Sequence, residues 1–398
     1  MRENGYMPAL DEQPRLMSRP EPVTPAAELS DEERRRYARH LTLPVFGDLG
    51  QRRLKNSRVA VVGAGGLGSP VLLYLAAAGV GHLTVIDADK VDDTNLQRQI
   101  IHGHDTLGTL KVDSAAARIA AINPLVTVSC IPQVLDSSNA LDILAGHDVV
   151  IDGTDNFPTR YLVSDACEIL DLPLVWGSIL AFDGQLAVFW NAGGRGVTYR
   201  DVHPTPPPPG SVQNCAEAGV LGMLCGQIGS AMANEAVKIL TGIGDVLLER
   251  IALYDALGAR WTHLDIARNP NRAAVTELVD YQDFCGVPRA DGGVGIADVA
   301  ALVDSGRALV DIRNDDEVAF GMLPGAVHIP MDRLLDDPHA ADRLLRERYR
   351  IATGLSGAVL YCQGGIRSAA ARSRLAEAGF NALTMNGGYS AAQSMLGH

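Results

Sequence analysis

The sequence lacks both an excess of basic residues and closely spaced cysteines. Its 34 Lys and Arg are outnumbered by 47 Asp and Glu, which gives a formal net charge of −13. Nucleic-acid binding needs a basic face, so no nucleic-acid partner is expected, although a nucleotide pocket needs only a few local cations. No two of the six cysteines are spaced as CxxC, which argues against a zinc knuckle and against the disulfide framework of a secreted protein.

Long apolar runs are also missing from the sequence. The longest, "PVLLYLAAAGVG", is too short to span a bilayer, and the N-terminus has no signal-peptide core. We therefore predict a cytoplasmic protein with reduced thiols and no membrane partner.

Strand and helix patterns alternate along most of the chain. The segments "RVAVVG", "LGSPVLLYLAAAG" and "HLTVIDAD" predict a strand, a helix and a strand, and "HDVVIDGTD" and "LPLVWGSIL" predict further buried strands. This alternation is typical of an α/β protein with a parallel sheet covered by helices. Ser30 and Glu33 have the spacing of a capping box, which predicts a helix start after a proline-rich, disordered tail at residues 1–29.

The pattern weakens near residue 270, and a second strand–helix pattern begins near residue 295. Prolines and glycines between these points predict a linker at residues 271–293. We therefore predict two α/β domains, a larger one at residues 30–270 and a smaller one at residues 294–398, in keeping with a chain of 398 residues.

A glycine-rich motif, "VVGAGGLG", joins the first predicted strand to the first predicted βα helix. Gly63, Gly65 and Gly68 fit GxGxxG, in which glycine lets the backbone approach a phosphate at a helix N-terminus. Asp87 closes the next strand, where a carboxylate can accept hydrogen bonds from ribose hydroxyls. Taken alone, these features predict a dinucleotide enzyme at least as readily as any other.

Charged residues near the same sheet edge favour a triphosphate. Arg98 follows the second strand, Lys111 opens the next helix, and Asp155 and Asn156 follow the strand "VVID". Cations offset the charge of a triphosphate, and a carboxylate can hold Mg²⁺ against it. The alternative is that Arg98 and Lys111 are solvated surface charges, as most such residues are.

Five ordered motifs resemble the MoeB/ThiF adenylyltransferases, relatives of the ubiquitin-activating enzymes: "RYARHLTLPVFGDLGQ", "GAGGLGSPVLLYLAAAGVG", "DADKVDDTNLQRQ", "TDNFPTRY" and "NCAEAGVLG". The resemblance implies a Rossmann-like homodimer that uses ATP to adenylate the C-terminal glycine of a ubiquitin-like sulfur-carrier protein ending in Gly-Gly. It also implies that Arg39 reaches into the active site of the second protomer. The residues expected to hold MgATP are Gly63, Gly65, Gly66, Gly68, Asp87, Thr94, Asn95, Leu96, Gln97, Arg98, Lys111, Asp155 and Asn156.

The chain departs from that family where many relatives bind zinc. Their two CxxC pairs are replaced here by "TYRD" at 198–201 and by "RNPNRAAV", so we predict no metal and a corner held by packing instead. Cys215, in "NCAEAG", has two interpretations. It is either a small buried residue or, as the resemblance implies, a thiol that attacks the acyl-adenylate or resolves a persulfide.

A second glycine-rich loop, "CQGGIRS", follows the strand-like run "GAVL" and precedes a helix. Cys362 is a candidate zinc ligand, phosphatase nucleophile, sulfur carrier or inert thiol. Four residues separate Cys362 from Arg367, one fewer than in a tyrosine-phosphatase loop, which suits a group as small as one sulfane sulfur. Inward-pointing N–H groups and Arg367 would favour a thiolate at Cys362. The predicted persulfide loop comprises Gln363, Gly364, Gly365, Ile366 and Arg367.

The second domain resembles the rhodaneses through "LVDIRNDDEVAFGMLPGAVHIP", "CQGGIRS" and "MNGGYSAA", and Asp311 and Arg313 are expected to brace its loop. The two domains in this order resemble MoeZ-type fusion proteins. That implies sulfur transfer from thiosulfate or a cysteine desulfurase, through a Cys362 persulfide, to give a carrier thiocarboxylate. The pathway stays open among molybdopterin, cysteine, thiolated tRNA and natural-product synthesis.

Two other functions compete with this interpretation. An NAD-dependent oxidoreductase with a redox cysteine would use the glycine loop and Asp87, but it leaves Arg98, Lys111, Asp155 and the second domain unexplained. A non-catalytic scaffold that binds carrier proteins would not need the intact set of charged residues.

Overall fold

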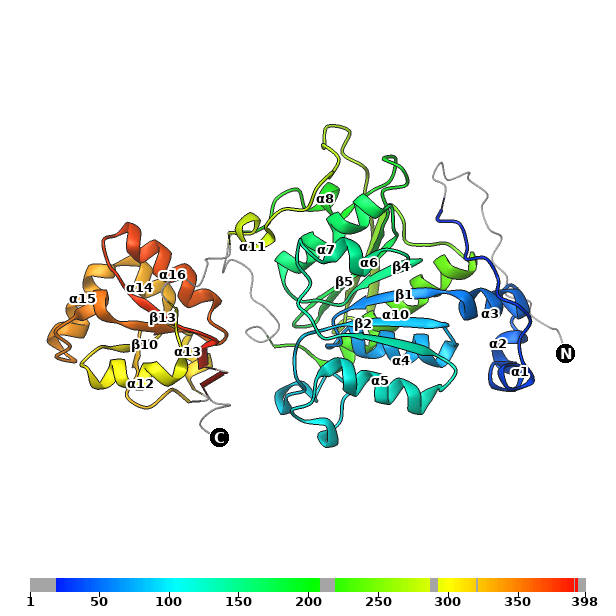
Figure 1. Ribbon diagram of the computed structural model, residues 1–398. Helices are drawn as coiled ribbons and strands as arrows, with labels where there is room; N and C mark the ends of the chain where they lie inside the picture. Colours follow the sequence, from blue (N-terminus) through cyan, green and yellow to red (C-terminus); the bar gives the residue numbers. More distant parts are fainter. Residues whose placement is uncertain (1–18, 208–218, 287–292, 320, 390, 393–398) are drawn as a thin grey trace.

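The computed structural model describes residues 19–207, 219–286, 293–319, 321–389 and 391–392. Within these residues the chain forms two α/β units, each built around its own sheet (Figure 1), which confirms the predicted fold class. No helix in the described part of the chain is both long and apolar enough to cross a lipid bilayer.

The first sheet has eight strands in the order β3-β2-β1-β4-β5-β6-β7-β8. The strands from β3 to β5 pair in parallel, and β6, β7 and β8 continue the sheet with antiparallel pairing. The chain leaves β1 toward β2 on one side and returns to β4 on the other, so a crevice opens beyond the carboxyl ends of β1 and β4. The strands are β1 (Arg58–Val62), β2 (His82–Ile86), β3 (Thr127–Ile131), β4 (Val149–Asp152), β5 (Leu174–Leu180), β6 (Asp183–Phe189), β7 (Arg250–Asp255) and β8 (Arg260–Asp265).

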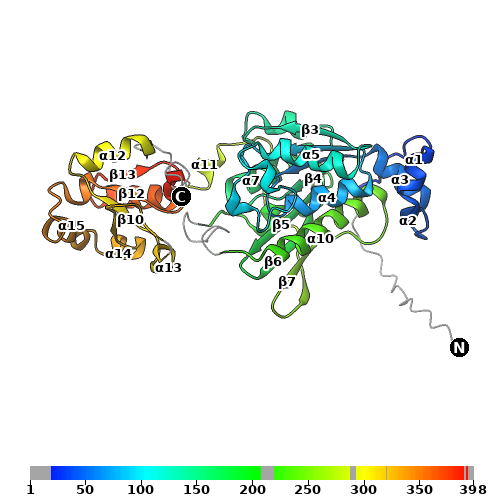
Figure 2. The same ribbon diagram turned by 90° about the horizontal axis from the view of Figure 1, so that it is seen from below.

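Helices cover both faces of this sheet (Figure 2). Val59 and Val61 of β1 point to one core, and Ala60 and Val62 point to the other, because alternate strand residues face opposite sides. The first core packs against α3 (Gly47–Asn56), α4 (Gly68–Ala78), α5 (Lys111–Ile122) and α10 (Gly222–Thr241). The second packs against α6 (Ala140–Leu144), α7 (Phe157–Leu170), α8 (Tyr199–Val202) and α11 (Tyr281–Phe284).

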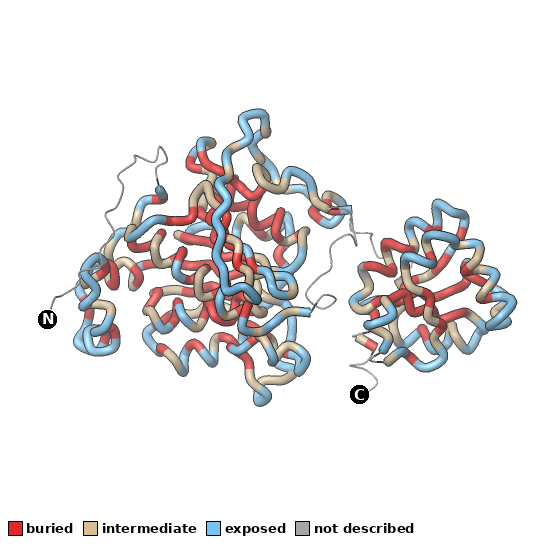
Figure 3. Tube along the Cα trace, turned by 180° about the vertical axis from the view of Figure 1, so that it is seen from behind, coloured by how far each residue is buried: buried red, intermediate tan, exposed pale blue. Residues whose placement is uncertain are grey.

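The second sheet has five parallel strands in the order β11-β10-β12-β13-β9. Its two central strands, β10 and β12, are buried along their whole length. Figure 3 shows such buried segments in red at the centre of each unit. The strands are β9 (Gly293–Val294), β10 (Leu309–Asp311), β11 (Val327–His328), β12 (Val359–Tyr361) and β13 (Leu383–Met385). The helices are α12 (Ile296–Asp304), α13 (Asp315–Val318), α14 (Met331–Asp336), α15 (Pro338–Glu347) and α16 (Ile366–Glu377).

The start of the described chain confirms one expectation and corrects another. Ser30 and Glu33 form the predicted capping box of α1 (Asp31–Arg36), which leads into α2 (Ala38–Leu41). Residues 19–29, however, were expected to be part of a disordered tail. They have no regular secondary structure, but the N–H groups of Val23 and Ala26 donate to the carbonyls of Leu240 and Arg52. Backbone pairing with α10 and α3 therefore orders this segment, while residues 1–18 lie outside the described part of the chain.

A buried ion-pair cluster joins the segments 198–201 and 268–275, which were predicted to be held together by packing. Arg272, in the segment "RNPNRAAV", donates to Glu168 of α7 and to Asp201 of α8, each at 3.0 Å. The side chains of Glu168 and Asp201 are 1% and 0% exposed. One guanidinium between two buried carboxylates thus ties together the two segments that replace the CxxC pairs.

Part of the predicted linker also packs onto the first domain. Tyr281 of α11 donates from its hydroxyl to Asp165 of α7 at 2.5 Å, and Arg200 of α8 binds the same carboxylate. Tyr281 and Cys285 are both buried in the second core of the first sheet. Residues 271–286 therefore belong structurally to the first domain, a result of contacts more than a hundred residues apart in sequence.

We expect Arg272→Met to lower the free energy of unfolding of the first domain by about 3–5 kcal/mol, because it leaves two buried carboxylates without their cation. Urea unfolding followed by tryptophan fluorescence measures this domain, since all three tryptophans lie in it. The control is Arg260→Met, which breaks an exposed pair with Asp255 and should cost only about 0–1 kcal/mol. Equal unfolding midpoints for Arg272→Met and the wild type would show that the cluster contributes no stability.

Candidate functional site

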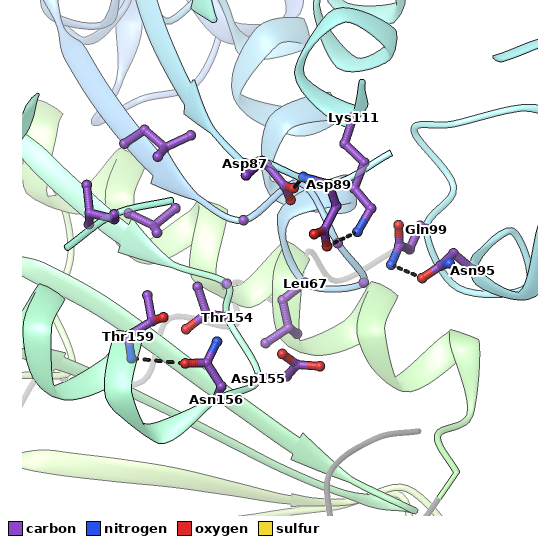
Figure 4. Close-up of a pocket in the computed structure, with 18 of the residues that line it drawn as sticks. Leu67, Asp87, Asp89, Asn95, Gln99, Lys111, Thr154, Asp155, Asn156 and Thr159 are labelled. Carbon is purple, nitrogen blue, oxygen red and sulfur yellow. Dashed lines mark hydrogen bonds and ion pairs between the residues drawn. The ribbon is translucent and has the colours of Figure 1, made fainter. Parts of the chain in front are cut away.

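A cavity of about 290 Å³ lies beyond the carboxyl ends of β1, β2 and β4, at the point where the strand order reverses (Figure 4). Open α/β sheets bind ligands at this position. The predicted residues that line it are Gly63, Gly65, Gly66, Asp87, Asn95, Arg98, Lys111, Asp155 and Asn156. The structure thus brings together residues that are far apart in the sequence.

The glycine loop is tightly packed against its surroundings. A Cβ at Gly68, the first residue of α4, would collide with the carbonyl of Gly63, and a Cβ at Gly66 would lie 2.8 Å from the Sγ of Cys225. Gly63 has φ of 91°, which disfavours any residue with a side chain. The loop therefore needs glycine for its own conformation and for its close packing against β1 and α10.

Two side chains orient the backbone of this loop. Asp87, which follows β2, accepts a hydrogen bond from the N–H of Ala64 at 2.9 Å. Buried His102 makes a hydrogen bond of 2.9 Å to the carbonyl of Ala64, and burial lowers the pKa of His102 below its usual range. The ring of His102 is therefore neutral near pH 7 and braces the loop without adding charge to the pocket.

Lys111 reaches the pocket from the first turn of α5. Its side chain is only 7% exposed, and Nζ donates to Asp89 at 2.8 Å, whereas the carboxylate of Asp89 is 72% exposed (Figure 4). A buried ammonium paired with an exposed carboxylate is held in place and can exchange its partner for an anionic ligand. The alternative of a solvated surface lysine is therefore wrong for Lys111, while Arg98 is half-buried at the pocket edge and donates to the carbonyl of Thr94.

The loop after β4 presents Asp155 and Asn156 to the opposite side of the pocket (Figure 4). Asp152, the last residue of β4, is fully buried and accepts from the N–H and hydroxyl of Thr154 at 2.9 and 2.7 Å. Burial raises the pKa of Asp152, and the nearby Arg160 opposes that shift. Asn156 caps α7 by accepting from the N–H of Thr159, so the position of Asp155 is set by anchored residues on both sides.

Several predicted residues lie outside the pocket lining. Gly68, Thr94, Leu96 and Gln97 belong to the same loops but do not line the cavity. Arg39 is on α2, which packs against α3 near the amino end of β1, so it cannot reach the pocket of its own chain at the carboxyl ends. Cys215 lies outside the described residues.

The structure adds pocket residues that the sequence reasoning missed. Asp89 pairs with Lys111, Gln99 bonds to Asn95 at 2.7 Å, and Arg160 donates to the carbonyl of Thr154. Cys225 of α10 is buried and lines the cavity against Gly66. Asp89 and Gln99 lie in the motif "DADKVDDTNLQRQ", so they could have been predicted as pocket residues from the sequence. Cys225 lies on α10, far from that motif in sequence, and no local pattern indicates that it reaches the pocket.

The second glycine-rich loop places Cys362 directly after β12. Cys362 is 1% exposed, and the N–H of Gly365 donates to its Sγ at 3.1 Å. Gly365 has φ of 95° and precedes the first residue of α16, and the N–H of Tyr389 fixes the carbonyl of Cys362 at 2.8 Å. The inward-pointing N–H expected from the sequence is therefore present at the sulfur, where it can stabilise negative charge.

Arginine–carboxylate pairs flank this loop. Arg313 pairs with Asp311 at 2.7 Å, lies 3.8 Å from the centre of the Tyr389 ring, and donates to the side chain of Gln363 at 3.1 Å. Arg367 donates to both oxygens of Glu317 in α13 at 2.6 and 2.7 Å. Asp311 and Arg313 brace the loop as expected, but the charge of Arg367 is matched by a carboxylate that the sequence reasoning did not single out.

Comparison with known proteins assigns both halves of the chain. The family model described as ThiF family matches residues 37–275, and the rhodanese-like domain model matches residues 296–395. The chain belongs to the ThiF family. It is 46% identical over 383 residues to the "Probable adenylyltransferase/sulfurtransferase MoeZ" of Mycobacterium tuberculosis, covering 93% of this chain and 95% of that protein.

Other relatives match one or both halves. The "Adenylyltransferase and sulfurtransferase MOCS3" of Drosophila yakuba is 42% identical, covering 78% of this chain and 72% of that protein. The "Sulfur carrier protein adenylyltransferase" of Thermus thermophilus is 50% identical, covering 64% of this chain and 98% of that protein. The chain is accordingly an enzyme, an ATP-using adenylyltransferase joined to a sulfurtransferase.

Solved structures support the fold of the larger domain. PaaA aligns with a TM-score of 0.53 at 23% identity, covering 61% of this chain and 76% of that one. The MccB protein of E. coli, crystallised with ATP, aligns with a TM-score of 0.52 at 19% identity, covering 60% and 74%. At these identities the likeness shows the fold alone.

Proposed function

We propose that the ThiF domain uses MgATP to adenylate the C-terminal glycine of a ubiquitin-like sulfur-carrier protein ending in Gly-Gly. The observation that carries this proposal is the set of charged residues around the glycine loop: Lys111 lies across the pocket from Asp155 (Figure 4), and Arg98 also lines the cavity. A nicotinamide cofactor has no use for this combination, whereas a triphosphate with its metal does.

Each side chain has a role that follows from its position. The backbone of the glycine loop approaches the phosphates, and Lys111 and Arg98 offset their charge as pyrophosphate leaves. Asp155 is the residue that would hold Mg²⁺, which neutralises the phosphates when bound. Asp87 turns one carboxylate oxygen to Ala64 and the other to the N–H of Asp89, and both oxygens retain acceptor capacity for ribose hydroxyls.

The rhodanese-like domain would supply the sulfur. The thiolate of Cys362 attacks the sulfane sulfur of a donor, and the donor's remaining part leaves with the electrons of the broken S–S bond. The persulfide of Cys362 then attacks the acyl-adenylate and releases AMP. A second thiol, for which Cys215 is the candidate, then attacks the Cys362 sulfur of the acyl disulfide. This frees the carrier thiocarboxylate and leaves a Cys215–Cys362 disulfide, which an external thiol must reduce before the next turnover. Arg39 would complete the adenylation site from the second copy in a homodimer, because its own pocket is out of reach.

The test is to incubate the full-length protein with purified carrier proteins, ATP, Mg²⁺ and a sulfur donor, and then to weigh the carriers. A carrier that gains one sulfur in exchange for one oxygen, with pyrophosphate released, supports the proposal. Pyrophosphate release without sulfur in the carrier would leave adenylation standing and remove the proposed relay. Absence of both products with every carrier ending in Gly-Gly would overturn the proposal.

A further inference from the structure

The active loop of the rhodanese-like domain carries a single charged side chain, and a carboxylate neutralises it. Arg367 is the only ionisable cation in "CQGGIR", and it donates one hydrogen bond to each oxygen of Glu317. The two side chains are 10% and 12% exposed. A bidentate arginine–carboxylate ion pair of this kind is strong and fixes the orientation of both side chains.

Glu317 is also held in place from its own helix. The N–H of Asn314 donates to Glu317 at 2.9 Å, which forms the capping box of α13. Burial by itself would raise the pKa of Glu317, but the hydrogen bonds from Arg367 and Asn314 hold it below its usual range. The carboxylate is therefore ionised at neutral pH and cancels the charge of Arg367.

The other cationic side chains described near the loop also face carboxylates, since Arg333 and His328 lie 4.0 and 3.7 Å from Asp315 of α13. Arg313, which contacts Gln363 of the loop, is itself matched by Asp311. The first turn of α13 carries Asp315 and Asp316 beside Glu317, and both are exposed. An anionic sulfur donor that approaches the loop past α13 thus meets carboxylates, and the two arginines at the loop itself, Arg313 and Arg367, are already paired.

We propose that Glu317 is a specificity-determining residue that disfavours the dianion thiosulfate and favours donors of lower charge, namely organic or protein-bound persulfides. The inference rests on the proposed role of Cys362. With thiosulfate, the Cys362 thiolate takes the outer sulfur and sulfite leaves with both negative charges. With a persulfide, the thiolate takes the outer sulfur and an organic thiolate leaves. The product in both cases is the same Cys362 persulfide, so only the charge brought into the loop differs.

The test uses Glu317→Gln in the full-length protein. Glutamine keeps the shape and can still accept the hydrogen bond of the capping box, but it no longer neutralises Arg367. The rate of persulfide formation on Cys362 is followed by alkylation and mass spectrometry, with thiosulfate or cysteine persulfide as donor. We expect the thiosulfate concentration for half-maximal rate to fall about tenfold, and that for cysteine persulfide to change less than about threefold.

Two variants serve as controls. Asp316→Asn removes a charge from the same helix turn without touching the ion pair, and Glu317→Asp keeps the charge on a shorter side chain. Both should stay within about twofold of the wild type with thiosulfate. An effect of Asp316→Asn as large as that of Glu317→Gln would overturn the specific role of Glu317, and so would an equal loss of rate with both donors, which marks a purely structural residue.

The salt dependence of the rate of persulfide formation with thiosulfate provides a second test. Because the loop repels the dianion, added salt should leave the thiosulfate rate unchanged or raise it, whereas in Glu317→Gln salt should lower it. A wild-type rate that falls steeply with salt would overturn the inference. Failure of the proposed function looks different, since then Cys362 forms no persulfide with either donor in any variant.

Discussion

We expect Cys362→Ala to abolish sulfur transfer by the full-length protein and to leave acyl-adenylate formation nearly intact. The reason is that a methyl group cannot carry sulfur, while Cys362 lies in the second sheet's domain, apart from the residues that line the nucleotide pocket. The change removes one buried Sγ and should preserve the fold, because alanine suits the strand end that it occupies. We expect the thiosulfate-to-cyanide sulfur transfer rate to drop to the background level.

The measurement combines three assays on the same protein. Carrier-dependent ATP–pyrophosphate exchange should stay within about twofold of the wild type, and carrier thiocarboxylate should disappear with thiosulfate as the sole donor. Free sulfide should restore part of the product, because the acyl-adenylate is electrophilic enough to react with it directly. The control is Cys130→Ala, which removes a partly buried thiol on β3 outside the pocket lining. Full thiocarboxylate yield from Cys362→Ala with thiosulfate alone would falsify the relay.

We expect Asp155→Ala to lower carrier-dependent ATP–pyrophosphate exchange by at least about a hundredfold. Asp155 is exposed in the pocket on a loop anchored by Asp152 and by the cap of α7, so its replacement should remove the proposed ligand for Mg²⁺ without disturbing packing. Preorganised groups aimed at a triphosphate typically contribute effects of this order or larger. The sulfur transfer rate from thiosulfate to cyanide should stay unchanged, because that reaction needs no ATP.

A matched control distinguishes the loss of Asp155 at the pocket from the loss of one exposed negative charge elsewhere on the domain. Asp142→Ala removes another exposed carboxylate from α6, outside the pocket lining, and should leave the exchange rate within about twofold. Equal unfolding midpoints for both variants establish that the fold is intact. Wild-type exchange in a folded Asp155→Ala protein would remove Asp155 from the metal site.

Much of the fold could be predicted from the sequence because the signals are local. Alternation of strand and helix patterns, the glycine motif and the capping box depend on neighbouring residues, and β1, α4, β2, β4 and β5 appear where these patterns predict them. The order of the strands then follows from general rules, and it brings the ends of β1, β2 and β4 to one crevice. This explains why the predicted pocket residues Gly63, Asp87, Lys111 and Asp155 do lie together.

The predictions that failed depend on partners far apart in the sequence. Residues 23–26 are ordered because α3 and α10 offer backbone partners, and residues 271–286 pack on α7 because Arg272 and Tyr281 find buried carboxylates there. Low periodicity correctly indicates little regular structure, since residues 19–29 and 271–286 contain only the four-residue helix α11. It carries no information, however, about whether such a segment packs against the rest of the domain.

The sequence by itself determined which chemistry-bearing residues this protein has and at which strand ends they lie, because motif spacing and strand position are local properties. Only the tertiary structure decided how their charges are matched. Lys111 pairs with Asp89 at the pocket, Arg272 bridges two buried carboxylates, and Arg367 is neutralised by Glu317, fifty residues away. An ion pair depends on which side chains meet in space, and burial then sets its strength, so the electrostatic character of both sites follows from the packing of distant elements.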